Sequence, residues 1–183
     1  MTDSRPFASD QPLFLIGFMA SGKTTVGRLV AARKGWAFRD LDQLITAAAG
    51  RSVAQLFADP AEGEAGFRRR EAAAVREAAA LRRTVIATGG GAACIEENLA
   101  RMLESGRVFA LSVSPDEAVR RAGSDGSRPL LARAADPRAA ATALLAAREP
   151  FYERAHARID TVGKRPEAVA EEVIRLLDAE PLA

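Results

Sequence analysis

The fold is decided by the stretch GFMASGKT at residues 17–24, which has the two glycines, the lysine and the hydroxyl residue of a phosphate-binding loop at the required spacing. The apolar run Pro12–Ile16 precedes it and is typical of a strand buried on both faces. The segment Val26–Lys34 follows it and is expected to be helical. A glycine-rich turn between a strand and a helix surrounds phosphate oxygens with backbone N–H groups at the positive end of the helix. The stretch therefore predicts a site for a nucleoside triphosphate.

The residue types within this loop predict distinct roles. The ammonium group of Lys23 is expected to reach the terminal phosphates, and the hydroxyl of Thr24 is expected to bind magnesium. Loops of this kind serve GTPases, motor ATPases and small-molecule kinases, so the rest of the chain must indicate what the nucleotide is for. The nucleotide-binding residues predicted in the loop are Ala20, Ser21, Gly22, Lys23, Thr24 and Thr25.

Short apolar runs alternate with segments of helical pattern along the chain. This alternation predicts an α/β domain with a five-stranded parallel sheet flanked by helices and with ligands at the carboxyl ends of its strands. Besides Pro12–Ile16, the expected strands are Trp36–Phe38, Thr84–Thr88, Arg107–Val113 and Ala157–Thr161. Expected helices include Glu62–Leu81, Pro137–Ala147, one capped by Ser114 and one opening at Pro166, and Arg148–Tyr152 is expected to join two helices.

The overall composition is that of an ordinary globular protein of one domain. The chain has 183 residues, 48% of them hydrophobic, and a formal net charge of +2. Its basic residues are scattered, which argues against nucleic-acid binding, and no apolar run is long enough for a membrane span. The single cysteine, Cys94, is expected to be a small buried residue in a cytoplasmic protein. We expect a flexible N-terminus over residues 1–11 and one domain over residues 12–183.

Several motifs beyond the loop are ambiguous when each is taken alone. Asp40 and Asp42 either place carboxylates near a metal and a hydroxyl or begin a helix, since apolar residues follow in helical rhythm. The arginines in GEAGFRRRE at residues 63–71 are typical of a solvated helix face. The triple glycine at residues 89–91 is either a plain loop or a place where the backbone approaches a ligand. The RPLL motif at 128–131 and REPFY at 148–152 complete the set.

Taken in order, these motifs resemble those of shikimate kinase over about residues 13–177. The resemblance implies a P-loop NTPase fold of the nucleoside-monophosphate-kinase type, with a mobile lid near residues 120–135. It also implies transfer of the γ-phosphoryl group of ATP to the 3-hydroxyl of shikimate in aromatic amino acid biosynthesis, with Mg²⁺ as cofactor. The partners are then ATP and shikimate, and the protein is expected to be a monomer.

The resemblance assigns a role to each matching residue. Asp40 is implied in metal binding together with Thr24, and Asp42 binds the substrate hydroxyls and is the candidate to accept the proton. Arg68 points inward to the substrate carboxylate together with Arg148, whereas Arg69 and Arg70 stay solvated. The catalytic residues are then Lys23, Asp42 and Arg128; the substrate site comprises Asp42, Arg68, Gly89, Gly90, Gly91 and Arg148; and Arg121, Arg128 and Lys164 join the nucleotide site. Glu64 and Glu71 are expected to orient the arginines.

Some expectations and alternatives rest on other residues. Ala20 stands where the family often has glycine, which a small side chain should tolerate. Trp36 and Phe38 are expected in the core and as walls of the substrate pocket, and His156 at the surface or at a helix end. A kinase for another hydroxy acid such as gluconate, or a nucleotide-binding regulatory module without catalysis, would share the phosphate loop. A GTPase would need an Asn/Thr-Lys-x-Asp motif, which the sequence lacks.

Overall fold

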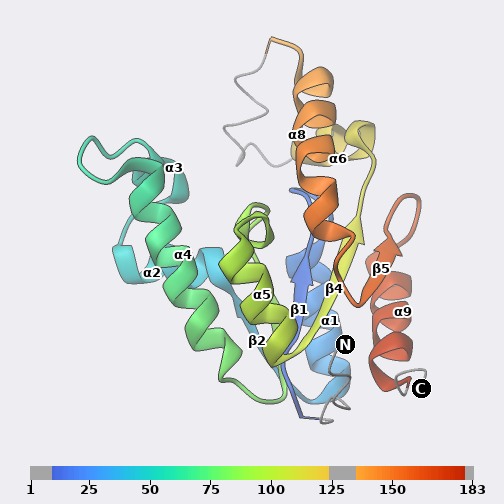
Figure 1. Ribbon diagram of the computed structural model, residues 1–183. Coiled ribbons are helices and arrows are strands. Elements are labelled where there is room, and N and C mark those ends of the chain that lie inside the picture. Colours follow the sequence, from blue (N-terminus) through green and yellow to red (C-terminus); the bar gives the residue numbers. More distant parts are fainter. Residues whose placement is uncertain (1–9, 124–134, 180–183) are drawn as a thin grey trace.

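A computed structural model describes residues 10–123 and 135–179 of the chain. Five parallel strands form one sheet in the order β2-β3-β1-β4-β5, and helices lie on both of its faces (Figure 1). The predicted α/β class and the five-stranded parallel sheet are therefore confirmed. The strands are β1 (Leu13–Ile16), β2 (Ala37–Asp40), β3 (Thr84–Ala87), β4 (Arg107–Ser112) and β5 (Ala157–Asp160).

The helices follow the expected alternation, with two additional short ones that the sequence did not indicate, α3 and α5. Within the described ranges, none of the helices is long and apolar enough to cross a membrane. The helices are α1 (Lys23–Lys34), α2 (Leu41–Ala49), α3 (Val53–Phe57), α4 (Gly63–Ala79), α5 (Glu96–Ser105), α6 (Pro115–Gly123), α8 (Pro137–Tyr152) and α9 (Pro166–Asp178), with a 3-10 turn, η1, at Ala92–Cys94.

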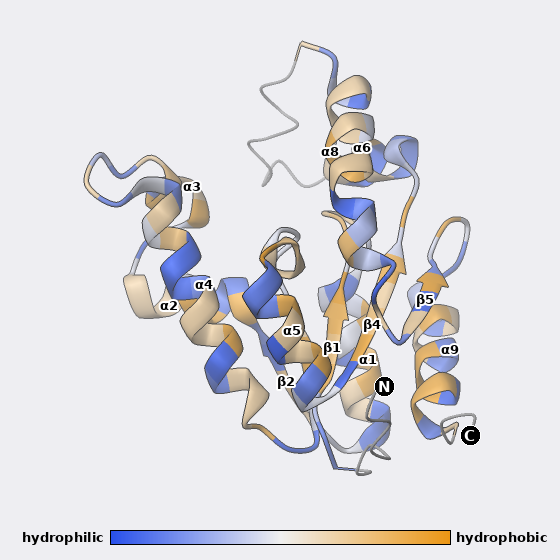
Figure 2. Cartoon of the chain, viewed as in Figure 1, coloured by the Kyte–Doolittle hydropathy of each residue, from blue (hydrophilic) through white to orange (hydrophobic). Residues whose placement is uncertain are grey.

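The central strand β1 divides the hydrophobic core into two halves. Leu13 and Leu15 pack toward α1 and α9, whereas Phe14 and Ile16 pack toward a cluster built from α4, α5 and α8. All four side chains are fully buried, and β1 and β4 stand out as apolar in Figure 2. Burial on both faces is the reason that this strand reads as a continuous apolar run in the sequence.

Asp40 and Asp42 lie at a strand-to-helix junction. Asp40 ends β2 and caps α2, because its Oδ1 accepts a hydrogen bond from the backbone N–H of Gln43 at 3.2 Å. Asp42 consequently lies in the first turn of α2. Of the two alternatives for this pair, the start of a helix is therefore confirmed, since Asp40 caps α2 and Asp42 lies in its first turn.

Helix α8 is longer than the sequence suggested. Arg148–Tyr152, which we expected to join two helices, forms its last turn and carries Pro150 inside the helix. A proline here removes one backbone hydrogen bond, so the turn depends more on contacts with the rest of the fold. Tyr152 supplies such a contact, because its hydroxyl donates to the carbonyl oxygen of Gly90 at 2.7 Å.

The strand register brings the predicted motifs to one edge of the sheet. Asp40 is level with Ala87, and Ala87 is level with Leu15 of β1. The segments that leave these strands are therefore the phosphate loop, the triple glycine and the start of α2. Asp10, which we placed in the flexible N-terminus, is held at the opposite end of the sheet, where its carbonyl oxygen accepts the N–H of Arg83 at 2.7 Å.

Candidate active site

A cleft of about 630 Å³ opens at the carboxyl edge of the sheet. Its volume is in the range of small-molecule and cofactor sites. Among the described residues that line it, four cationic side chains face three carboxylates. The predicted site residues in the lining are Ala20, Gly22, Lys23, Thr24, Thr25, Asp40, Asp42, Arg68, Gly89, Gly90, Gly91, Arg121 and Arg148.

The phosphate loop is wrapped around the ammonium group of Lys23. Its Nζ donates to the carbonyl oxygens of Gly17 at 2.9 Å and Phe18 at 2.8 Å, and Ser21 Oγ lies 3.4 Å away. The side chain is buried beneath the loop. The positive charge therefore lies inside the ring of backbone that would surround the phosphates, at the N-terminus of α1.

Gly17 is required by close packing where β1 enters the loop. Its φ is +137°, and a Cβ at this position would lie 2.3 Å from the carbonyl oxygen of Leu111 on the neighbouring strand. No L side chain fits both the backbone conformation and the space. The first glycine of the motif thus permits the loop to leave the sheet against β4.

Ala20 adopts a left-handed conformation, with φ of 60°. A Cβ in this region of backbone conformation costs roughly 1 kcal/mol or more. We expect Ala20→Gly to raise the free energy of unfolding in urea by about 1 kcal/mol. The KM for ATP should stay within twofold, because the carbonyl of residue 20 keeps its bond from Arg121. A loss of stability in the variant would contradict the assignment of strain to Ala20.

Thr24 and Asp40 form an oxygen-rich corner beside the loop. The Thr24 hydroxyl donates to Asp40 Oδ2 at 2.7 Å. Magnesium prefers hard oxygen ligands and is often held by one or two protein oxygens together with phosphates and water. Among the described residues, no group of three or more acidic, histidine or cysteine side chains is placed to hold a metal ion. The corner fits a magnesium ion that arrives with a nucleotide.

Asp42 and Glu71 converge above Gly89. A Cβ on Gly89 would lie 2.7 Å from Asp42 Oδ1 and 2.8 Å from Glu71 Oε1, so glycine is what makes room for both carboxylates. The Glu71 side chain is 1% exposed. Burial raises its pKa, the neighbouring Arg68 opposes that rise, and the charge of Asp42 adds to it. Two acceptor groups at one point of the cleft suit a ligand that brings several hydroxyl groups.

Arg68 projects from α4 into the cleft and is held by two glutamates. Its Nη1 donates to Glu71 Oε2 at 2.7 Å and its Nη2 to Glu64 Oε1 at 3.1 Å. The aromatic rings of Phe57 and Phe67 lie under the guanidinium. Both glutamates pair with Arg68 as predicted, whereas Arg148 donates to the carbonyl oxygen of Gly90. Arg69 and Arg70 are exposed and pair with Glu62, as expected of the solvated face.

Arg148 approaches the cleft from α8 on the other side of the triple glycine. Its Nη1 donates to the carbonyl oxygen of Gly90 at 3.1 Å. A Cβ on Gly90 would lie 3.5 Å from that guanidinium, and a Cβ on Gly91 would lie 2.9 Å from the guanidinium of Arg68. Two arginines thus reach consecutive glycines from different helices. Guanidinium groups so placed are suited to a carboxylate.

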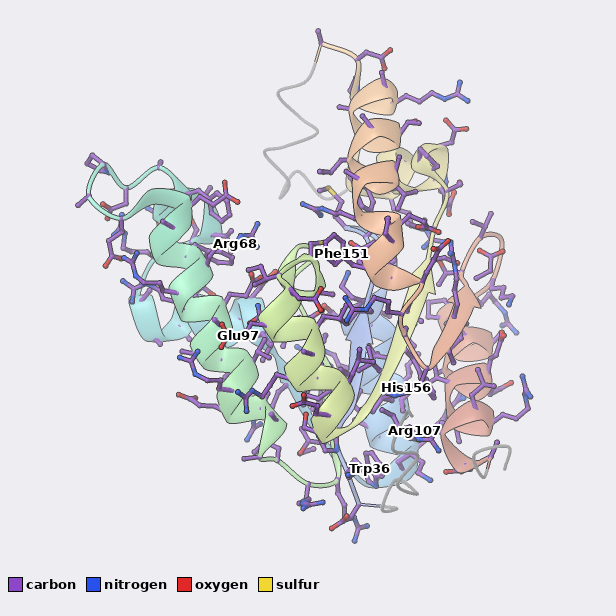
Figure 3. The ribbon with its side chains drawn as sticks, viewed as in Figure 1. Trp36, Arg68, Glu97, Arg107, Phe151 and His156 are labelled. Carbon is purple, nitrogen blue, oxygen red and sulfur yellow. The ribbon has the colours of Figure 1, made fainter. Side chains whose placement is uncertain are left out.

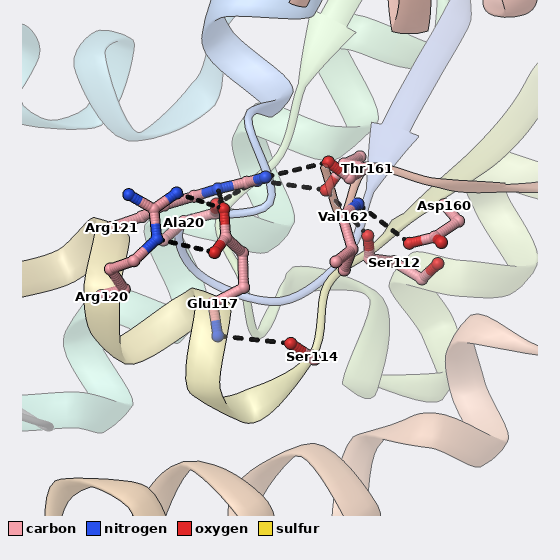
Figure 4. Close-up of polar contacts among 9 residues, drawn as sticks. All are labelled: Ala20, Ser112, Ser114, Glu117, Arg120, Arg121, Asp160, Thr161 and Val162. Atoms are coloured by element: carbon pink, nitrogen blue, oxygen red, sulfur yellow. Dashed lines mark hydrogen bonds and ion pairs between the residues drawn. The ribbon is translucent and has the colours of Figure 1, made fainter. Parts of the chain in front are cut away.

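Arg121 joins the phosphate loop to two other parts of the fold (Figure 4). Its Nη1 donates to the carbonyl oxygen of Ala20 at 3.2 Å, and its Nη2 to that of Thr161 at 2.9 Å. Its Nε donates to Glu117 at 2.7 Å on the same helix, and Ser114 caps that helix as the sequence predicted. The guanidinium therefore lies at the nucleotide end of the cleft.

Among the described residues, two predicted site residues, Ser21 and Lys164, do not line the cleft. Lys164 is absent from its described lining, and its Nζ pairs with Glu172 at 2.8 Å. Arg128 and most of the predicted lid fall on residues 124–134, outside the described ranges. The role of Arg128 stays a prediction.

The expected pocket walls are wrong. Trp36 and Phe38 pack in the cluster toward α1 and α9 and do not line the cleft. The reason is positional, because Trp36 precedes β2 and so lies at the amino end of the parallel sheet. Figure 3 shows it far along the molecule from Arg68. The walls are instead Val53, Phe57 and Phe67, whose sequence pattern is that of ordinary core residues.

His156 lies at the surface as expected, whereas Cys94 is less buried than expected. His156 is exposed just before β5, where its Nδ1 accepts the backbone N–H of Val108 at 2.9 Å. Burial of part of the ring lowers its pKa, as does the charge of Arg107. Cys94 is half-buried and free, and burial raises the pKa of its thiol. A thiol in that state is a weak nucleophile.

A family model, curated sequences and solved structures all match this chain to the same family. The family model for shikimate kinase matches residues 19–178. The chain is 48% identical to the shikimate kinase of Moorella thermoacetica over 91% of its own length and 94% of the relative. It is similar in structure to the shikimate kinase from Acinetobacter baumannii in complex with shikimate, with TM-score 0.86 and 33% identity over 91% and 92% of the two chains. A gluconokinase from Sinorhizobium meliloti 1021, TM-score 0.59 over 91% of each chain, is only 16% identical and shows the fold alone.

Proposed function

The chain belongs to the shikimate kinase family, a family of ATP-dependent phosphotransferases, and we propose that it transfers the γ-phosphoryl group of ATP to the 3-hydroxyl of shikimate. The assignment of the acceptor rests on one observation: four features line the same cleft. The phosphate loop, the triple glycine with its two flanking arginines, and Asp42 all line this cleft. The triple glycine lies beside the loop, because a Cβ on Gly90 would lie 3.4 Å from the backbone nitrogen of Met19.

The acceptor end of the cleft is proposed to bind shikimate through its carboxylate and its hydroxyls. Arg68 and Arg148 supply the cationic donors, held by Glu71 and by the carbonyl oxygen of Gly90. Asp42 Oδ1 and Glu71 Oε1 face the ring hydroxyls above Gly89. The apolar walls Val53, Phe57 and Phe67 cover the carbon skeleton. Such a site discriminates against acceptors that lack the acid group, because the arginines would lose their partner.

The nucleotide end is proposed to bind Mg²⁺-ATP. Lys23 and the loop amides would hold the β- and γ-phosphates. Arg121, which donates to the carbonyl oxygen of Ala20 in the loop, would pack beside the base. Thr24 and Asp40 would hold Mg²⁺, Asp40 through water, and the ion supplies charge neutralisation between the β- and γ-phosphates when it is bound.

The chemical step is an in-line displacement. The 3-hydroxyl oxygen forms a bond to the γ-phosphorus as the bond between that phosphorus and the β,γ-bridging oxygen breaks, and ADP leaves. The hydroxyl proton passes to Asp42. Lys23 stabilises the charge that develops on the phosphoryl oxygens. Catalysis then depends mostly on positioning and electrostatics, as is usual for phosphoryl transfer.

The test is a coupled ATPase assay with a panel of hydroxy acids. Purified protein should consume ATP in the presence of shikimate and Mg²⁺, and should release shikimate 3-phosphate. Gluconate, which would be the acceptor if the chain were a gluconate kinase, should give no turnover above background. ATP binding without turnover on any acceptor would instead favour the regulatory module.

A further inference from the structure

The carbonyl oxygen of Gly90 accepts two hydrogen bonds from one turn of α8. Tyr152 Oη lies 2.7 Å from it and Arg148 Nη1 lies 3.1 Å from it. A carbonyl oxygen has two lone pairs, so these two donors occupy it fully. The two side chains are four residues apart on the helix and therefore share a face.

The peptide between Gly90 and Gly91 has little intrinsic preference for one orientation. Glycine on both sides leaves the backbone free to rotate, and a Gly-Gly peptide can turn over at low cost. The described peptide bonds are all trans, so the N–H of Gly91 points opposite to the carbonyl of Gly90. Whatever fixes that carbonyl also fixes the direction of the N–H.

Tyr152 is well suited to hold the carbonyl. Its side chain is 4% exposed, and burial raises the pKa of its phenol, so the hydroxyl stays protonated and able to donate. The hydroxyl has a single proton, and the bond to Gly90 uses it. Arg148 has five N–H donors, and one of them goes to the same carbonyl oxygen.

We propose that Tyr152 is a positioning residue for the acceptor site. Its hydroxyl holds the Gly90–Gly91 peptide in one orientation and, through the shared carbonyl, fixes the guanidinium of Arg148. Tyr152 itself is not one of the described residues that line the cleft. The proposal rests on the proposed function, in which Arg148 and the triple glycine bind shikimate.

The experiment compares Tyr152→Phe with Thr84→Val, a matched loss of a buried hydroxyl. Thr84 Oγ1 donates to the carbonyl oxygen of Arg82 at 2.7 Å, at the opposite end of the strand that leads to the triple glycine. Loss of one hydrogen bond predicts a KM for shikimate raised roughly 5- to 10-fold in Tyr152→Phe. The KM for ATP should stay within twofold in both variants, and the KM for shikimate should stay within twofold in Thr84→Val.

Equal KM values for shikimate in the two variants would overturn the proposal and leave Tyr152 a structural residue. Absence of shikimate turnover in the wild type would overturn the proposed function instead, so the two failures are distinguishable. If Tyr152→Phe does not fold, the wild type still provides a test, because the chain has 1 tyrosine. Labelling with 3-fluorotyrosine gives a single ¹⁹F resonance that shikimate should shift and Mg²⁺-ADP should leave nearly unchanged. A resonance that saturating shikimate does not move would contradict the proposal.

Discussion

Asp42→Asn is expected to lower kcat for shikimate phosphorylation about 100- to 1,000-fold, which is the usual effect of removing a general base. The amide has the shape of the carboxylate and can still orient a hydroxyl, but it cannot take the proton. Both KM values should change only a few fold. Steady-state kinetics with each substrate varied in turn measure the effect.

The position of Asp42 supports this expectation. It lies in the first turn of α2, and its Oδ1 faces the same point above Gly89 as Glu71 Oε1. Phosphoryl transfer needs alignment of the hydroxyl more than a strong base, so a kcat that falls less than tenfold would limit Asp42 to orientation. Asp178→Asn is the matched control, because this carboxylate pairs with Lys34 at the far end of α9 and should leave kcat unchanged.

The phosphate loop was predictable because its chemistry is local. The stretch from Gly17 to Thr24 is contiguous, and each residue type has one physical reason to be there. The same holds for the cap at Ser114, which needs only residues one turn away. The inward direction of Arg68 could not be predicted from its local sequence. Arg68 by itself reads as a solvated side chain, and only the ordered set of motifs indicated that it points inward.

The errors concern which aromatic residues form the walls of the cleft. Trp36 and the wall residue Phe57 are both aromatic residues near apolar neighbours. The first lies at the amino end of β2, and the second, at the end of α3, lines the cleft. The three-dimensional arrangement of α2, α3 and α4 decides which aromatic residue lines the cleft. The amino-acid composition of these short helices does not show how they are arranged.

The last turn of α8 was missed for a similar reason. Pro150 predicts an interruption from local chemistry, since it cannot donate a backbone hydrogen bond. The helix nevertheless continues to Tyr152, whose hydroxyl and Arg148 are both tied to Gly90. Contacts between residues about sixty positions apart therefore support this turn, and two of these residues, Gly90 and Arg148, line the cleft.

Arg68→Ala and Arg148→Ala are each expected to raise the KM for shikimate about 10- to 100-fold and to leave the KM for ATP within threefold. Each replacement removes a charge-assisted hydrogen bond to the substrate carboxylate, which contributes about 1.5–3 kcal/mol. Arg69→Ala is the matched control on the same helix, because its side chain is exposed and paired with Glu62. Its KM for shikimate should equal that of the wild type.

The carboxylate assignment can be separated from a general loss of packing by changing the ligand as well as the protein. The carboxamide of shikimate lacks the negative charge, so the wild type should bind it about as weakly as Arg148→Ala binds shikimate. If the arginine acts on the carboxylate, the two losses should not add: Arg148→Ala should discriminate little between the acid and the amide. Full additivity would mean that the guanidinium supports the fold or the Gly90 turn and does not read the acid group.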